Sequence, residues 1–129
     1  MAMPKRLQQF IGGLTPRTEI EQQLVKILTR RLENSLAALD RVAGGSCSDC
    51  YRQLVNCIWQ EGAASCFDRY EECLEGSITS GLRRMPTESE ENLIGQVVDH
   101  IVGITEALLS LGGVSLQEEE EPGGDAGDA

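Results

Sequence analysis

Two capping boxes divide most of this chain into helices. Thr18 pairs with Glu21 in the first box and Thr87 with Glu90 in the second, at the spacing that lets each side chain bond the other residue's backbone amide. Apolar residues then recur at three- and four-residue steps. The first run is Ile20, Leu24, Ile27, Leu28, Leu32, Leu36, Leu39 and Val42, and the second is Leu93, Ile94, Val97, Val98, Ile101, Ile104, Leu108 and Leu109. No alternating strand pattern competes, so the sequence predicts an all-α fold.

A third helix is predicted over residues 51–62, and it ends in a tight corner. Its apolar stripe consists of Leu54, Val55, Ile58 and Trp59. Gly62 can adopt the left-handed conformation that closes a helix. Ser65 can then cap a following helix that starts near Cys66. We therefore expect two helices to meet across three residues.

The helix after this corner, over residues 66–83, is only half apolar. One stripe carries Phe67, Tyr70, Leu74, Ile78 and Leu82, and the opposite side carries Asp68, Arg69, Glu71, Glu72 and Glu75. A helix surrounded on all sides could not leave so many charges unpaired. The charged side is therefore expected to face a solvated groove or a dimer surface.

Length and charge favour one domain with an acidic tail. The 129 residues are 40% hydrophobic, enough for one ordinary core, which we assign to residues 1–116. The net charge is −10, from 21 acids and 11 bases, and six of the acids lie between Glu118 and Asp128. Residues 117–129 are rich in charge and glycine and are predicted to be a disordered tail.

Several function classes are not expected. No basic patch with interleaved aromatics is present, so nucleic acid is not a predicted partner. No uninterrupted apolar run reaches the roughly 18 residues of a membrane span, so we predict no transmembrane anchor. Cys47 and Cys50 form only half of a zinc site, and His100 is the one histidine. No phosphate loop or nucleophile elbow is found, and we predict no enzymatic activity, metal or cofactor.

The string RQLVNCIWQEG resembles the segment that leads into the BH1 motif of the Bcl-2 family of apoptosis regulators. The matching positions are Leu54, Val55, Asn56, Trp59, Glu61 and Gly62. Gly76 with Ser77 is similar to a small pair in the family's central helix, and the Gly112–Gly113 turn is similar to the opening of BH2. The chain departs from the family where Asp68 occupies the position of its arginine, with Arg69 one position late, and where Val114 replaces a tryptophan.

The resemblance implies a Bcl-2-like helical bundle around a central helix and a function as an inhibitor of apoptosis. Such a protein sequesters pro-apoptotic BH3 helices, from BH3-only proteins such as Bim or from Bax and Bak, here with a narrow ligand range. The missing anchor suggests a viral member, cytoplasmic or peripheral to the mitochondria of a host cell. The implied BH3 groove contains Leu36, Leu39, Val42, Tyr51, Leu54, Ile58, Glu61, Arg69 and Leu74.

The five cysteines support a competing hypothesis. Cys50 and Cys57 are seven residues apart, as are Cys66 and Cys73, so each pair lies on one face of its helix. Folded as a hairpin, the faces could form two bridges, which resembles the twin-cysteine hairpins of the mitochondrial intermembrane space. Cys47 would remain for an intermolecular disulfide in a homodimer. The protein would then be a non-enzymatic helical adaptor. The other interpretation is reduced cysteines that serve as small core residues in a cytosolic protein.

Overall fold

The computed structural model describes residues 3–15, 18–43 and 46–117. The helices are α1 (Lys5–Gly12), α2 (Glu19–Ala43), α3 (Ser46–Glu61), α4 (Ser65–Leu82) and α5 (Glu88–Leu111). Within these ranges the only β-type pairing is an isolated bridge between Ala63 and Gln117. The predicted all-α class is confirmed. The predicted acidic tail falls, apart from its first residue, outside the described residues.

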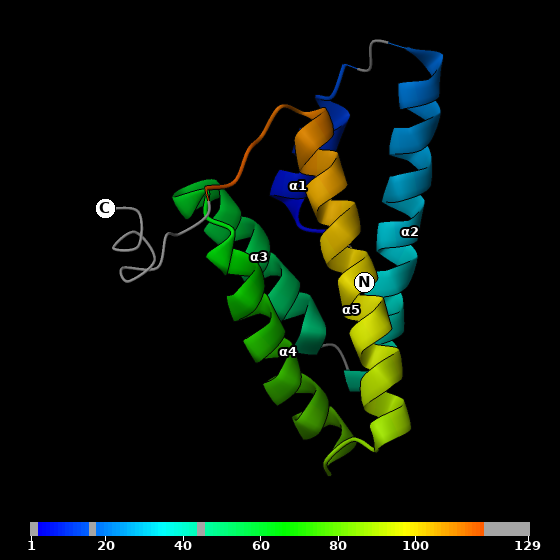
Figure 1. The fold of residues 1–129 in the computed structure, drawn as a ribbon, viewed down its shortest axis with the longest axis vertical. Coiled ribbons are helices and arrows are strands. Elements are labelled where there is room, and N and C mark those ends of the chain that lie inside the picture. Colours follow the sequence, from blue (N-terminus) through cyan, green and yellow to red (C-terminus); the bar gives the residue numbers. More distant parts are fainter. Residues whose placement is uncertain (1–2, 16–17, 44–45, 118–129) are drawn as a thin grey trace, which may run out of the picture.

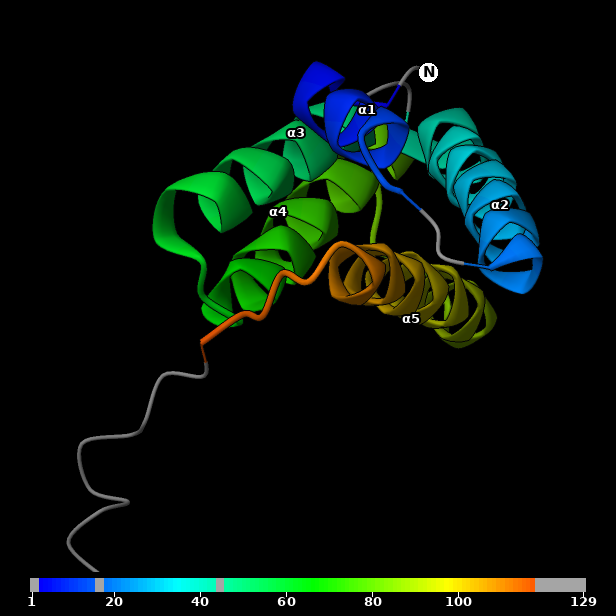
Figure 2. The same cartoon turned by 90° about the horizontal axis from the view of Figure 1, so that it is seen from above.

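The long helices form two antiparallel pairs. Figure 1 shows α3 and α4 as one hairpin and α2 and α5 as a second pair, and Figure 2 shows the same arrangement from above. The closest packing is within these pairs, and α2 also packs on both helices of the hairpin. α1 covers one end of the molecule, where the ring of Phe10 meets Trp59 of α3 edge to face at 5.5 Å. Gly112 lies so close to Phe10 that a Cβ there would clash with the ring.

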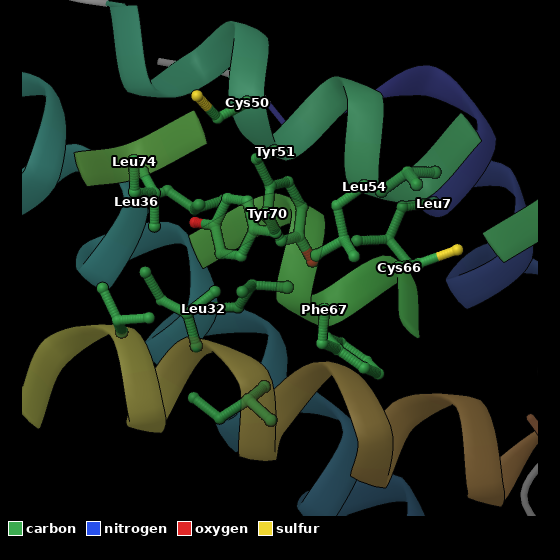
Figure 3. Close-up of a cluster of buried hydrophobic side chains, with 14 of the residues drawn as sticks. Leu7, Leu32, Leu36, Cys50, Tyr51, Leu54, Cys66, Phe67, Tyr70 and Leu74 are labelled. Carbon is green, nitrogen blue, oxygen red and sulfur yellow. The ribbon is translucent and has the colours of Figure 1, made fainter. Parts of the chain in front are cut away.

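The core lies between the two pairs. Figure 3 shows side chains from α1, α2, α3 and α4 converging above α5, with Leu32 and Phe67 on the side of α5. The side chains with no exposed surface include Leu7, Leu32, Tyr51, Cys66, Ile101 and Leu108. Burial of a side chain of this size stabilises the fold by about 2 kcal/mol. Through Leu7, the short helix α1 therefore contributes to the core.

One buried hydrogen-bond chain links α3 to α5. The Thr105 hydroxyl donates to the Ile101 carbonyl at 2.8 Å, and the Tyr51 hydroxyl lies 2.8 Å from the Thr105 oxygen. Because the Thr105 proton is already used, Tyr51 is the donor of the second bond. Burial raises the pKa of Tyr51 well above its usual value, so the phenol stays protonated. Tyr70 packs on it edge to face at 5.7 Å.

The helix ends mostly follow the sequence signals. The Thr87–Glu90 box is complete, with the Glu90 amide donating to Thr87 Oγ1 at 3.2 Å and the Thr87 amide to Glu90 Oε1 at 2.9 Å. At α2, the Glu21 amide donates to Thr18 Oγ1 at 3.1 Å. α4 begins one residue earlier than expected, at Ser65, with Ala64 at the N-cap. Gly62 has φ of 61°, the left-handed conformation that the corner requires.

α5 is long and apolar enough to cross a bilayer by length and composition alone. In this fold its apolar face packs on α2 and on the core, with Ile101, Ile104, Leu108 and Leu109 buried. A core helix of a soluble protein has the same composition. One third of its most apolar window is buried in the fold, and the absence of a transmembrane anchor stays a prediction.

Glu90 should make stability depend on acid pH. Bonds from Arg84 and from the Thr87 amide lower its pKa from 4.5 to about 2. Because the unfolded chain binds this proton more readily, the stabilisation is complete above pH 4.5 and is lost as pH falls toward 2. Glu90→Gln should flatten this part of the stability curve, measured by urea midpoints at neutral pH and at about pH 3. Glu88→Gln, on the same turn, is the control and should keep the acid slope of the native protein.

Candidate functional site

Two disulfides clamp the α3–α4 hairpin. Cys50 is bonded to Cys73 and Cys57 to Cys66, with Cα–Cα distances of 5.6 and 5.8 Å. The seven-residue spacing puts both cysteines of a helix on one face, and the antiparallel hairpin brings the two faces together. The bridged alternative is therefore confirmed. The interpretation as reduced core cysteines is wrong for these four residues, because their sulfurs are close enough across the hairpin to bond.

An ion pair closes the corner beside the inner bridge, Cys57–Cys66. Arg69 Nη1 and Nη2 donate to the two carboxylate oxygens of Glu61 at 2.6 and 3.0 Å. Nη1 also lies 3.4 Å from the Cys57 sulfur. These bonds lower the pKa of Glu61, mainly through the hydrogen bond from Arg69. The two side chains are 55% and 43% exposed, so the pair orients the guanidinium more than it stabilises the fold.

The predicted BH3-groove residues are found in two places. Glu61 and Arg69 lie exposed at the corner. The apolar members come together in the closed core, each no more than 4% exposed. They are Leu36, Leu39, Tyr51, Leu54, Ile58 and Leu74, several of which are labelled in Figure 3. The side chain of Val42 is outside the described part of the chain. Trp59 is 37% exposed and packs on α1.

An open groove lies between α4 and α5, and Leu74 is the one described member of the predicted BH3-groove set that lines it. Although a short turn joins these helices, α4 packs on α3 and α5 packs on α2, and the two diverge from the turn (Figure 1). The α4–α5 groove has a volume of about 590 Å³. Its apolar lining residues are Leu74, Ile78, Met85, Ile94 and Val98. Its acidic lining residues are Glu71, Glu75, Glu91 and Asp99. None of the described residues that line it is basic.

The α4–α5 groove agrees with one of the two expectations from the sequence. The charged side of the 66–83 segment predicted either a solvated groove or a dimer surface. Glu71 and Glu75 from that side are groove-lining residues, while the exposed Glu72 is not among them. No sequence signal indicated the α5 side of the groove. That side forms only because α5 packs on α2 and diverges from α4.

Cys47 is the free thiol among the described cysteines, and it is buried. Burial, and secondarily the nearby Asp40 carboxylate, raise its pKa to about 11. The thiol therefore remains protonated at neutral pH, the unreactive form. The intermolecular bridge predicted for Cys47 stays a prediction, and it requires this end of α3 to open.

One group of side chains has the spacing of metal ligands. The Cys57 and Cys66 sulfurs and a Glu61 carboxylate oxygen lie within 4.8 Å of one another. Metals bind the thiolate form of cysteine, and these two sulfurs are bonded to each other. Arg69 also occupies the Glu61 carboxylate. The arrangement therefore acts as a covalent clamp.

No family model, curated protein or solved structure matches this chain.

Proposed function

We propose that this chain is a non-enzymatic helical adaptor whose disulfide-clamped hairpin holds a helix-binding surface in a fixed shape. The observation that carries the proposal is the pair of bridges, Cys50–Cys73 and Cys57–Cys66. They fix α4 against α3, and α4 also packs on α2, while a further side of α4 lines the groove. A surface that is rigid before binding loses less conformational entropy when a partner docks. The groove presents apolar side chains and carboxylates, which are suited to binding a partner protein.

We further propose that the protein works in an oxidising compartment. Structural disulfides persist where thiols are not kept reduced by glutathione and thioredoxin. The mitochondrial intermembrane space, which holds the twin-cysteine hairpins that this chain resembles, is the compartment we favour. The sequence predicted a cytoplasmic location, and we propose the intermembrane space in its place.

Thiol trapping in living cells tests this function. Cells that make the protein are quenched with acid, and free thiols are alkylated with a heavy maleimide before electrophoresis. We expect only Cys47 to be modified, because the other four cysteines are bridged. Modification of all five would contradict the proposal. Partners crosslinked in cells should also be lost from Cys57→Ala/Cys66→Ala, and an unchanged set of partners would count against the clamp.

Inhibition of apoptosis remains a second candidate. It is supported by the corner at Gly62 and by the turn at Gly113, which have φ of 61° and 78° and match the resemblance to BH1 and BH2. A Bcl-2-like groove would also require the buried Leu54 and Ile58 to be uncovered. Titration of labelled BH3 peptides, including that of Bim, with and without reductant separates the candidates. Saturable submicromolar binding of a BH3 peptide would establish the apoptosis candidate and overturn the adaptor proposal.

A further inference from the structure

We propose that the α4–α5 groove binds a basic amphipathic helix of a partner protein. The partner's apolar stripe would lie on the groove floor and its lysine or arginine side chains at the acidic rim. This inference rests on the proposed adaptor function and names the chemistry of its partner.

The floor of the groove has the pattern that receives a helix. Leu74 and Ile78 are four residues apart on α4, and Ile94 and Val98 are four residues apart on α5. Leu74, Ile78 and Val98 are at most 8% exposed and form the bottom of the groove, so the apolar surface that a partner reaches comes mainly from Ile94 and Met85. Each pair is a ridge along one helix, so the groove has two apolar walls. A volume of about 590 Å³ admits several side chains of one stripe, while the partner backbone stays at the mouth. Met85 is 71% exposed at the turn, and its flexible side chain can adapt to the partner.

Charge decides which helix fits. The rim carries Glu71 and Glu75 from α4 and Glu91 and Asp99 from α5, with no basic residue among the described lining. Lysine or arginine beside the partner's apolar stripe would meet these carboxylates, while an acidic helix would be repelled. The groove therefore selects for positive charge on the partner.

A second copy of this chain is a weaker candidate. Ile20, Leu24 and Ile27 form an exposed apolar ridge on α2, 81%, 41% and 48% exposed, which could enter the groove of another molecule. The chain has a net charge of −10, however, and the repulsion between two copies opposes that contact. A basic partner gains attraction from the same charge.

A glycine in the groove permits a clean test. Gly95 of α5 is a lining residue, and no atom lies within 4 Å of the position of an added Cβ. Gly95→Phe should therefore fill the groove without disturbing the core. Gly103→Phe is the matched control, because Gly103 is on the same helix, is exposed, has the same free space and is not a groove-lining residue.

The probe is a labelled synthetic helix of about four turns, with leucine on one face and lysine and arginine beside it. It is titrated into the oxidised full chain and followed by fluorescence anisotropy. We expect saturable binding that weakens about tenfold or more in Gly95→Phe and is unchanged in Gly103→Phe. A peptide with glutamate in place of every basic residue should not bind. Circular dichroism verifies the fold of each variant.

A charge-reversal pair tests the rim. Glu75→Lys/Glu91→Lys/Asp99→Lys should abolish binding. Glu72→Lys/Glu88→Lys/Glu106→Lys changes the net charge equally, on the same two helices and outside the groove, and should retain most of the binding.

Several results would overturn this proposal. They are no binding of the basic peptide, equal loss in both triple variants, or equal loss in both glycine variants. Self-association in sedimentation that Gly95→Phe abolishes, without peptide binding, would instead identify a second copy as the occupant. Bridged cysteines in cells with no peptide binding would leave an adaptor that uses another surface. Peptide binding with reduced cysteines in cells would keep the groove and remove the proposed compartment.

Discussion

Removal of the outer disulfide, Cys50–Cys73, should lower the free energy of unfolding by about 3 kcal/mol, because the bridge joins cysteines 23 residues apart in the sequence. The substitution is Cys50→Ala/Cys73→Ala, because alanine leaves no unpaired hydroxyl in the core. The melting temperature should fall by about 10 °C. The inner pair closes only nine residues, so Cys57→Ala/Cys66→Ala should cost less. Urea unfolding of the oxidised proteins, followed by circular dichroism, measures both losses.

The control for this prediction is the reductant itself. A strong reductant should destabilise the native protein by at least as much as the outer-pair substitution. It should have no effect on a variant that lacks all four bridging cysteines. If the native protein unfolds at the same urea concentration with and without reductant, the bridges do not stabilise the fold.

Leu54→Glu should unfold the protein, with a loss of about 4 kcal/mol or more, because Leu54 is 2% exposed and a carboxylate there would lose its hydration without gaining a partner. If Leu54 instead lined the floor of an open BH3 groove, the variant would stay folded and lose only ligand capture. The same substitution thus separates a core residue from a groove residue. Far-ultraviolet circular dichroism and urea unfolding provide the measurement.

Asn56→Glu is the matched control for Leu54→Glu. Asn56 is two residues away on the exposed side of α3, and the substitution adds the same charge. It should change the free energy of unfolding by no more than about 0.5 kcal/mol. Equal stability of the two variants would contradict the closed core and favour the apoptosis candidate.

Much of the fold could be predicted from local signals. The capping box at Thr87 fixes the start of α5. Only three residues, Gly62 to Ala64, separate α3 from α4, so the chain reverses direction in a tight corner. α1 was not among the helices predicted from the sequence. Its signal was the helical spacing of Leu7, Phe10 and Ile11, too short a pattern to define a helix without its packing partners.

The site was harder to predict than the helices. Seven-residue spacing puts Cys50 and Cys57 on one face, but which cysteine meets which depends on the hairpin forming and on its register. The groove depends on tertiary packing, which local sequence signals do not encode. Ile94 and Val98 of α5 line it only because α5 packs on α2 and diverges from α4. Leu54 and Ile58 could not be assigned to core or groove, because an apolar stripe has the same spacing in both cases.

Disulfide mapping tests the central claim most directly. The unreduced protein is unfolded, its free thiol is alkylated, and it is digested with trypsin, which cleaves after Arg41, Arg52, Arg69 and Arg83. The disulfide-clamped hairpin predicts that peptide 42–52 is bonded to peptide 70–83 through Cys50 and Cys73, that peptide 53–69 contains an internal Cys57–Cys66 bond, and that Cys47 is alkylated. Alkylation of all five cysteines, or a bond between peptides 42–52 and 53–69, would contradict it.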